Sequence, residues 1–419
     1  MEDVLITGLG IVSPIGIGRE AVRSAIESRT SGITTIDDYA KAGWLAPYGG
    51  RVTDFEPKEY VKPRKSMKVM AHEIQMAFAA AEMAVSDAGL EEGSIDPERS
   101  GVVLGAGSMY CDLEELVDAY RSCSTEQGFD FNKWGDAAKR ELFPLWMLKY
   151  LPNMPACHIG IRHDARGPTN TISHGEISSL LALAEAMQVI RRGQADVMFV
   201  GGTSTRLSIT DLVWHGGARM AHGDLSPAEA CRPFDAKRQG MVMGEGAAVM
   251  VLESRTHAER RGQQPLARVL SVATRSCQTA KRFDPPVPAI ENALSVALER
   301  AEIAPSELAH INAHGLGTLE DDPAEAQAIA KVLDGADVPV TSPKSYFGNL
   351  GAGCGAMELV VSLLAANEGA VPPTLNHEQT DPACPVRVAA ETEATTRKAF
   401  AALNHTNTGQ AVAAILACD

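Results

Sequence analysis

Seven short apolar runs of β-strand type, each followed by a helical pattern, constrain the fold of this chain more than any other feature. They lie at residues 4–6, 101–104, 196–200, 247–252, 267–272, 310–313 and 411–416. Such alternation is typical of α/β architecture with buried sheets. The 419 residues can bury a large core, and no long Ser/Gly/Pro linker divides them. The sequence therefore predicts one compact α/β unit, with the charged segment 253–264 as the join between two halves.

The charge and the cysteines of the chain exclude several classes of function. The formal net charge is −15, whereas a nucleic-acid surface needs an excess of Lys and Arg. The first ten residues hold no positively charged leader, and no window approaches the roughly 20 apolar residues of a membrane span. The eight cysteines form neither a CxxC pair nor a zinc spacing, which predicts free thiols without disulfides or a metal. We therefore expect a cytoplasmic protein that binds no nucleic acid and has no membrane span.

A local basic cluster stands out against this acidic background. It consists of Lys58, Lys62, Arg64, Lys65 and Lys68, and it precedes an apolar helical segment. Two interpretations remain open, a solvated entry to the helix or a docking surface for an acidic partner.

Residues 110–151 follow the strand–helix alternation less regularly than the rest of the chain. They mix polar runs with the aromatic residues Phe129, Phe131, Trp134, Phe143 and Trp146. We expect this segment to leave the core and to cover a partner or a pocket.

Four stretches of sequence together resemble one protein family. They are VLITGLGIVSPIG at 4–16, GQADVMFVGG at 193–202, RPFD at 232–235 with GEG at 244–246, and NAHG at 312–315 with Asp322 and Glu325. In this order, and over essentially the whole length, they are similar to the signatures of the elongating β-ketoacyl-carrier-protein synthases of the thiolase superfamily.

This resemblance implies a fold and a set of partners. The expected thiolase fold is a duplicated βαβαβ core in five αβαβα layers, with an N-terminal half over residues 1–255, which includes the irregular segment 110–151, and a C-terminal half over 256–419. The implied assembly is a homodimer, or a heterodimer with a cysteine-bearing ketosynthase. Family members take acyl chains from the phosphopantetheine arm of an acyl carrier protein, so this chain needs no cofactor of its own. Because carrier proteins are acidic, Lys62, Arg64, Lys65 and Lys68 become candidate docking residues.

Glu176 occupies the position at which the resemblance places the nucleophilic cysteine. The alignment follows from counting back without a gap from Gly193, through a helix whose apolar residues recur at helical spacing. Family members attack with a thiolate at this helix N-terminus, where the helix dipole favours negative charge. A carboxylate attacking a thioester would instead form a mixed anhydride, which hydrolyses rapidly. Since Cys157 and Cys354 lie in no matching motif, the exchange predicts loss of ordinary condensation.

Two further loops depart from the family pattern. Asn349 stands where elongating synthases usually have a second histidine, while Lys344 is retained. His314 and Asn349 are neutral hydrogen-bond donors, so they could still form an oxyanion site, or His314 could merely brace a loop. Near the C-terminus, Asn407 aligns with the gating phenylalanine of the family. Thr406 and Thr408 replace glycines there, which predicts a stiffer gating loop or a polar turn without catalytic constraint.

Three functions fit these departures. The favoured hypothesis is a non-condensing partner subunit that binds acyl chains or carrier protein, as chain-length factors of fatty-acid or polyketide assembly do. The second is a malonyl-carrier-protein decarboxylase that uses His314 and Asn349. The third is an acyl-thioester hydrolase or transferase with Glu176 as general base. The sequence leaves open whether any activity remains, which pathway the chain serves, and whether Glu176 is charged.

Overall fold

In a computed structural model of the chain, one large sheet runs through the whole molecule. The structure describes residues 2–44, 46–91, 93–215, 219–222, 225–279 and 284–418. The strand order is β13-β12-β16-β17-β11-β1-β10-β9-β5-β8, and β2 (Gly16–Ile17) pairs with β1 outside this path. The N-terminal strands are β1 (Val4–Ser13), β5 (Ser100–Ala106), β8 (Thr169–Ile172), β9 (Val197–Thr205) and β10 (Glu245–Ser254). The C-terminal strands are β11 (Ala267–Ser276), β12 (Leu308–Asn312), β13 (Val340–Thr341), β16 (Ala399–His405) and β17 (Gln410–Ala417).

The path consists of two halves with the same topology. In each half the first strand pairs antiparallel with the fifth, and the fifth pairs antiparallel with the fourth. The fourth pairs parallel with the second, and the second pairs parallel with the third. The halves meet where β1 and β11 pair antiparallel, with Val4 opposite Val269. The predicted duplicated α/β fold is confirmed.

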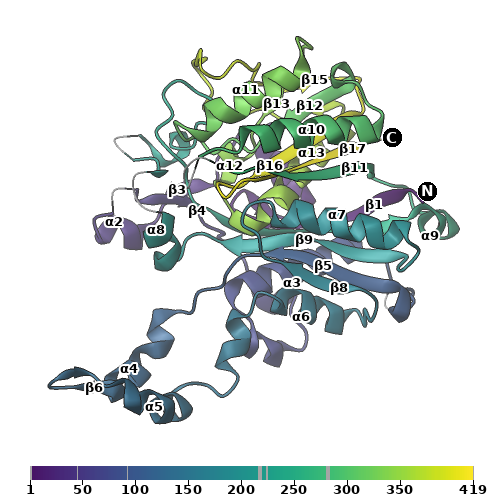
Figure 1. Cartoon of the computed structure of the whole chain (residues 1–419). Helices are drawn as coiled ribbons and strands as arrows, with labels where there is room; N and C mark the ends of the chain where they lie inside the picture. Colours follow the sequence, from purple (N-terminus) through teal and green to yellow (C-terminus); the bar gives the residue numbers. More distant parts are fainter. Residues whose placement is uncertain are drawn as a thin grey trace.

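The helices complete a five-layered arrangement, which Figure 1 shows from the side. The middle layer consists of α7 (Ser178–Arg191) and α13 (Cys354–Asn367), which contact each other and the strands on either side. The outer layer of the N-terminal half contains α3 (His72–Asp87) and α6 (Met154–Arg162). The outer layer of the C-terminal half contains α10 (Val287–Ala301) and α11 (Asp321–Leu333). The predicted boundary between residues 255 and 256 falls at the start of α9 (Arg255–Arg260), between β10 and β11.

Alternating side chains of the central strands bury both faces of the sheet. Along β9, Met198 and Val200 pack into the middle layer, whereas Val197 and Phe199 pack against the outer helices. A strand buried on both faces needs a continuous apolar run, which is the pattern that the sequence shows.

Close packing of α3 on β1 explains two glycines of the first strand. A Cβ atom on Gly10 would collide with the carbonyl oxygen of Ala80, and one on Gly8 would collide with that of Ala84. Small residues on both elements therefore let the helix backbone approach the strand directly.

The segment between β5 and α6 projects from the body of the molecule (Figure 1). It contains α4 (Val117–Cys123), β6 (Ser124–Thr125), β7 (Gly128–Phe129) and α5 (Trp134–Glu141). Phe131 is 74% exposed in this segment, and Tyr120 and Phe129 are also exposed. We call residues 110–151 the excursion.

Shorter elements complete the chain. They are α1 (Arg19–Glu27), α2 (Asp37–Lys41), α8 (Ile209–His215), α12 (Lys344–Phe347), β3 (Ile33–Thr35), β4 (Tyr48–Gly50), β14 (Ala370–Val371) and β15 (Glu393–Ala394). No helix in the described part of the chain combines the length and the hydrophobicity that crossing a lipid bilayer requires.

Candidate functional site

Glu176 lies just before the start of α7, one of the two helices of the middle layer. It directly precedes Ile177, the N-cap residue of α7. Its Oε1 accepts a hydrogen bond from Arg206 Nη2 at 2.6 Å and one from Asn349 Nδ2 at 3.4 Å. The side chains of Glu176 and Arg206 are only 15% and 11% exposed. Because a guanidinium is always protonated and an ion pair favours the charged acid, this arrangement favours the carboxylate form of Glu176.

Arg206 also faces a second carboxyl group. It follows the last residue of β9, and its Nη1 lies 3.9 Å from Asp211 Oδ1 in α8. Burial raises the pKa of Asp211, and the charge of Glu176 adds to this shift. Neither Arg206 nor Asp211 lies in one of the sequence motifs. The signal for Arg206 was indirect, since a buried carboxylate requires a cation nearby.

His314 is positioned by two carboxyl groups of α11. Its loop follows β12, and the backbone N–H groups of His314 and Gly315 donate to the Glu325 carboxyl at 2.7 and 2.8 Å. Gly317 N–H donates to Asp322 at 2.9 Å. Burial raises the pKa of Glu325 to about 8 and that of Asp322 to about 7, although these N–H donors oppose the shifts. The two acidic residues that accompany the NAHG motif therefore shape its loop.

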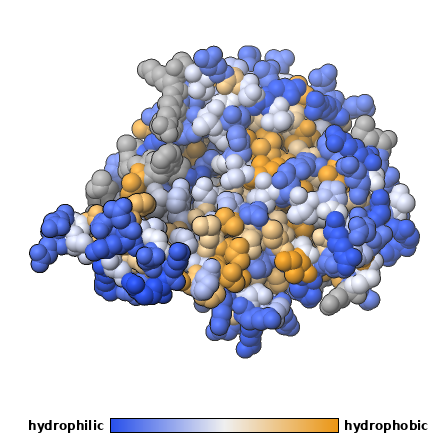
Figure 2. All heavy atoms as spheres, turned by 60° about the horizontal axis from the view of Figure 1, so that its bottom comes forward, coloured by the Kyte–Doolittle hydropathy of each residue, from blue (hydrophilic) through white to orange (hydrophobic). Residues whose placement is uncertain are grey.

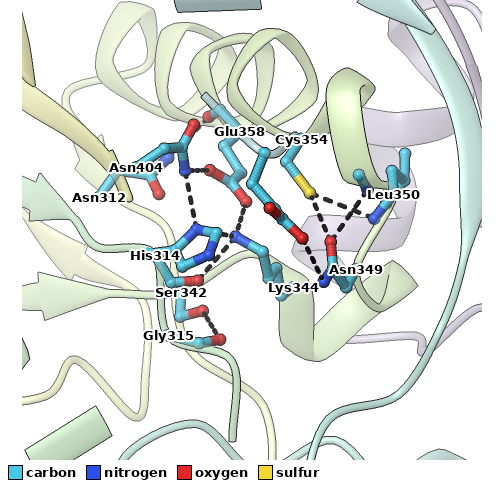
Figure 3. Close-up of polar contacts among 12 residues, drawn as sticks. Asn312, His314, Gly315, Ser342, Lys344, Asn349, Leu350, Cys354, Glu358 and Asn404 are labelled. Atoms are coloured by element: carbon cyan, nitrogen blue, oxygen red, sulfur yellow. Dashed lines mark hydrogen bonds and ion pairs between the residues drawn. The ribbon is translucent and has the colours of Figure 1, made fainter. Parts of the chain in front are cut away.

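The ring of His314 is held in one tautomer. Its Nδ1 lies 3.0 Å from Lys344 Nζ and 3.1 Å from Asn404 Nδ2, and Figure 3 shows these groups pointing toward one another. Since an ammonium group can only donate, Nδ1 accepts and the proton of the neutral ring is on Nε2. Burial, reinforced by the charge of Lys344, holds the pKa of His314 well below its usual value. His314 is therefore a neutral N–H donor.

Lys344 is neutralised by Glu358, which the sequence analysis missed. The two side chains form a fully buried ion pair, and Asn404 Nδ2 donates to the other carboxyl oxygen at 2.7 Å. Burial lowers the pKa of Lys344, but the ion pair with Glu358 and the other acidic groups nearby together raise it, so that the net pKa lies above the usual value. A glutamate within the otherwise apolar run of α13 was the available signal for this pair.

Asn349 connects Glu176 to the start of the segment that leads into α13. Its Oδ1 accepts from Gly351 N at 2.9 Å and from Cys354 Sγ at 3.2 Å, and Figure 3 shows Cys354 pointing at Asn349. Burial raises the pKa of the Cys354 thiol to about 12. Although Cys354 belongs to the site, it therefore carries no thiolate with which to attack an acyl group.

Two cavities meet at Glu176. The outer cavity has a volume of about 400 Å³ and is lined by Tyr110, Arg206 and Thr406, among others. The inner cavity, of about 40 Å³, is lined by His314 and Asn349. Glu176 and Asn407 line both, and so form a partition between them. Because about 10–15 Å³ of such volume suffices for one water, the inner cavity has room for a few waters and is much smaller than the outer cavity.

The predicted gating loop is held by its own side chains. Thr406 Oγ1 and Thr408 Oγ1 lie 2.9 Å apart, and they donate to Gln410 Oε1 at 2.9 and 2.8 Å. Asn407 lies between the two threonines and lines both cavities. The stiffness of the loop stays a prediction, for which these bonds supply a physical cause.

The candidate docking residues lie on the surface, outside these cavities. Lys62, Arg64, Lys65 and Lys68 are all exposed. Three of them belong to a short 3₁₀ segment, Arg64–Val69, that precedes α3. The structure thus brings together Glu176, His314, Lys344 and Asn349, with the loop 406–408 beside them, and keeps the basic cluster apart.

Comparisons with known proteins identify the relatives of this chain. The model of the N-terminal domain of β-ketoacyl synthases matches residues 1–258, and that of the C-terminal domain matches residues 266–378. The ketoacyl synthase alpha subunit of the tetracenomycin polyketide synthase of Streptomyces glaucescens is 33% identical over 388 residues, which cover 91% of this chain and 89% of that protein.

Solved structures agree with these relatives. One solved structure is the complex of a type II polyketide synthase acyl-carrier protein with its ketosynthase. A chain of this complex superposes on the present one with a TM-score of 0.87 at 25% identity, over the full length of both chains. The ishigamide ketosynthase/chain length factor superposes with a TM-score of 0.86 at 26% identity, over 100% of this chain and 99% of that one.

Proposed function

Because this chain belongs to the β-ketoacyl synthase family, we propose that it is a non-condensing partner subunit, which binds acyl chains or carrier protein beside a cysteine-bearing ketosynthase. The observation that carries this proposal is the ion pair of Glu176 and Arg206 at the start of α7. Condensation by this family needs a thiolate at that place, and a carboxylate held by a guanidinium does not supply one. The intact fold and the retained His314 network are compatible with a subunit whose catalytic step has passed to its partner.

The geometry argues against decarboxylation of malonyl groups by the chain as it stands. Asn349 Nδ2 already donates to Glu176, and the donor face of His314 opens on a cavity of about 40 Å³. A malonyl carboxylate would also meet the negative charge of Glu176, which opposes its binding.

Hydrolysis with Glu176 as general base has no more support. The hydrogen bond from Arg206 Nη2 occupies a carboxylate oxygen at 2.6 Å. Since the ion pair stabilises the carboxylate, it weakens the tendency of Glu176 to take a proton from water.

Exposed hydrophobic side chains support a partner subunit. The excursion carries Tyr110, Leu113, Tyr120, Phe129, Phe131, Phe143, Leu145 and Met147 in exposed positions. Figure 2 shows hydrophobic residues gathered over the middle of the face that lies at the bottom of Figure 1, flanked by hydrophilic residues. Patches of this kind typically mark protein–protein contacts. The relative solved with its carrier protein supports a second partner, an acyl carrier protein that would dock at the basic cluster.

Co-expression with a cysteine-bearing ketosynthase of the same organism tests this function. We expect a stable complex in which acyl label from the carrier protein becomes attached to the ketosynthase and not to this chain. Substitution of the partner's catalytic cysteine by alanine should abolish condensation, whereas Glu176→Ala in this chain should preserve it. A stable acyl thioester on this chain, or loss of condensation in Glu176→Ala despite an intact complex, would overturn the proposal.

A further inference from the structure

A third cavity lies between the first turn of α3, the two ends of the excursion and the start of α8. We call it the α3 cavity. Its volume is about 550 Å³, and Tyr110 lines both this cavity and the outer one. A cavity of this size suits a small organic ligand.

Acidic side chains outnumber basic ones in the α3 cavity. The described residues that line it include four acids and two bases, namely Glu73, Asp112, Glu114, Glu115, His72 and Lys149. Both bases are already engaged. Lys149 forms an ion pair with Glu115, and His72 Nε2 lies 3.4 Å from Oε1 of Glu245, which is not among the lining residues. With the remaining acids ionised, the wall of the cavity carries an excess of negative charge.

Glu73 is the acid of this wall that most needs a partner. It is only 6% exposed, and it lines the cavity from the first turn of α3. In the described part of the chain, its carboxyl group has no ion pair, and its own backbone N–H is its hydrogen-bond donor. Burial raises the pKa of Glu73, although this N–H group and His72 oppose the shift. Burying a carboxylate without a cation is costly.

The start of a helix accounts for an acidic residue at this position but not for its burial. The dipole and the free N–H groups of α3 favour a carboxylate in the first turn. An exposed carboxylate would gain the same interaction without leaving water. A positively charged ligand in the cavity would compensate the burial of Glu73, as Arg206 does for Glu176 beside the outer cavity.

Aromatic rings in the wall favour an organic cation over a metal ion. Tyr110 and Tyr150 line the α3 cavity together with the acids. The face of an aromatic ring attracts an ammonium group, and the alkyl carbons next to that group gain free energy by leaving water. Lys149 makes such a contact within the chain, since its Nζ lies 5.5 Å from the centre of the Tyr150 ring.

From these observations we infer that the α3 cavity binds a small organic cation, with an alkylammonium group placed at Glu73. This site is separate from Glu176 and concerns no step of acyl transfer. The inference goes beyond the proposed function and does not depend on it, because every residue that carries it belongs to this chain.

Isothermal titration of the full chain at constant ionic strength tests the inference with three probes, pentylamine, pentan-1-ol and magnesium chloride. Pentylamine is protonated at pH 7, as a lysine side chain is, and it has the same length as the alcohol. We expect pentylamine to bind at least about tenfold more tightly than either of the other probes. Equal binding of the alcohol would show that the cavity does not recognise charge, and equal binding of magnesium would indicate a metal site. Either result would overturn the inference.

Removal of single carboxylates places the binding in this cavity. Glu73→Gln keeps the shape of the side chain and should abolish the preference for pentylamine over pentan-1-ol. Glu299→Gln removes the same charge at an exposed position of α10, so this matched control should leave the preference unchanged. Asp112→Asn, at an exposed position of the wall, should weaken binding of pentylamine about threefold, and it serves if Glu73→Gln does not fold. Unchanged binding in both cavity variants would contradict the inference.

Thermal unfolding distinguishes a ligand site from a purely structural role of Glu73. If this carboxylate served only the start of α3, Glu73→Gln would lower the Tm of the ligand-free protein. A ligand site predicts a higher Tm for the ligand-free variant, because an amide costs less to bury than a carboxylate without a cation. Pentylamine should raise the Tm of the wild-type protein and leave that of the variant unchanged. A lower Tm for the ligand-free variant would count against the inference.

Discussion

The ion pair of Glu176 and Arg206 places two opposite charges side by side in a largely buried position, where each stabilises the other. Both side chains are largely buried. Burying a charge is costly unless an opposite charge and hydrogen bonds compensate it, so removing one partner is far worse than removing both. Loss of one partner of this ion pair is therefore expected to change the stability of the protein as well as the chemistry of the site.

Arg206→Met should destabilise the protein by about 2–4 kcal/mol, because the carboxylate of Glu176 would remain partly buried without this partner. Urea denaturation measures the loss. Arg121→Met is the matched control, since the pair of Arg121 with Asp118 is 76% and 73% exposed and should contribute less than about 1 kcal/mol. If the two variants lost equal stability, the ion pair at the site would have no special role.

Glu176→Ala should create a malonyl decarboxylase. The substitution removes the partition between the two cavities and releases Asn349 Nδ2, so that His314 and Asn349 can hold an enolate. We expect acetyl-carrier protein to form from malonyl-carrier protein on the order of tenfold or more above the wild-type rate, as followed by mass spectrometry. Addition of His314→Ala should return the rate to background. If the wild-type chain decarboxylated malonyl-carrier protein as fast as the variant, Glu176 would not act as a partition between the two cavities.

At this scale the sequence identifies the residues that replace or retain family positions, and the structure adds those that support them. Glu176, His314, Lys344 and Asn349 could be found because they lie in motifs. Arg206, Glu358 and Asn404 lie outside the motifs, and their roles depend on contacts between segments far apart in the chain. A motif identifies the residues at the family's active-site positions. The groups that neutralise the charges of these residues come from other parts of the chain and are brought there by tertiary packing.

Among the elements, neighbouring strands β12 and β16 carry histidines that are buried without charge. Burial lowers the pKa of His310 to about 3 and that of His405 to about 4. His310 stacks on Phe400 with ring centroids 5.1 Å apart, and its Nε2 lies 3.0 Å from Ser362 Oγ. These histidines must gain protons when the protein unfolds in mild acid.

His310→Gln should make stability less sensitive to acid. Below the unfolded pKa of about 6.5 the unfolded chain binds a proton that the folded chain does not, so His310 contributes full stability above that pH and loses it as the pH falls toward 3. Asp322 and Glu325, with raised pKa values, act in the opposite direction, so the measurement is the difference between variant and wild type. This difference in the free energy of unfolding should shrink between pH 7.5 and pH 5. A difference in the free energy of unfolding that stayed constant over this pH range would contradict the lowered pKa of His310.

The 3₁₀ segment before α3 is the element proposed to dock the carrier protein. Arg64→Glu combined with Lys65→Glu should weaken binding of the carrier about tenfold at low salt, and added salt should reduce this effect. Surface plasmon resonance at two salt concentrations measures it. Lys41→Glu combined with Arg192→Glu changes the net charge equally at other exposed positions and should have little effect. Equal weakening by both pairs would indicate a response to net charge alone.

The strands show where sequence patterns fail. All seven predicted runs overlap strands of the main sheet, but β2, β8, β13 and β16 were missed. β8 is polar, β13 has two residues, and β16 is rich in alanine, which favours helices. These strands form because neighbours in the sheet satisfy their backbone groups, and a local pattern does not contain that information.

For the whole molecule, the middle layer joins the two halves and holds the site between them. Glu176 belongs to the N-terminal half, and His314 and Asn349 belong to the C-terminal half.

Leu180→Ala in α7, at a fully buried position, should lower the free energy of unfolding by about 2–5 kcal/mol. Ile161→Ala, at a position 79% exposed, should change it by less than about 0.5 kcal/mol. Similar losses in both would show that the middle layer is not the shared core.

The pairing of β1 has a consequence for how the protein folds during its synthesis. Val4 lies opposite Ser254 on one side and Val269 on the other, so both edges of the first strand are satisfied by segments that the ribosome releases much later. Until then only the end of this ten-residue strand has a partner, because Val12 and Ser13 pair with β2. Long-range pairing of this kind slows folding and exposes the chain to aggregation. We therefore expect the emerging polypeptide to depend on a chaperone until translation has passed β11.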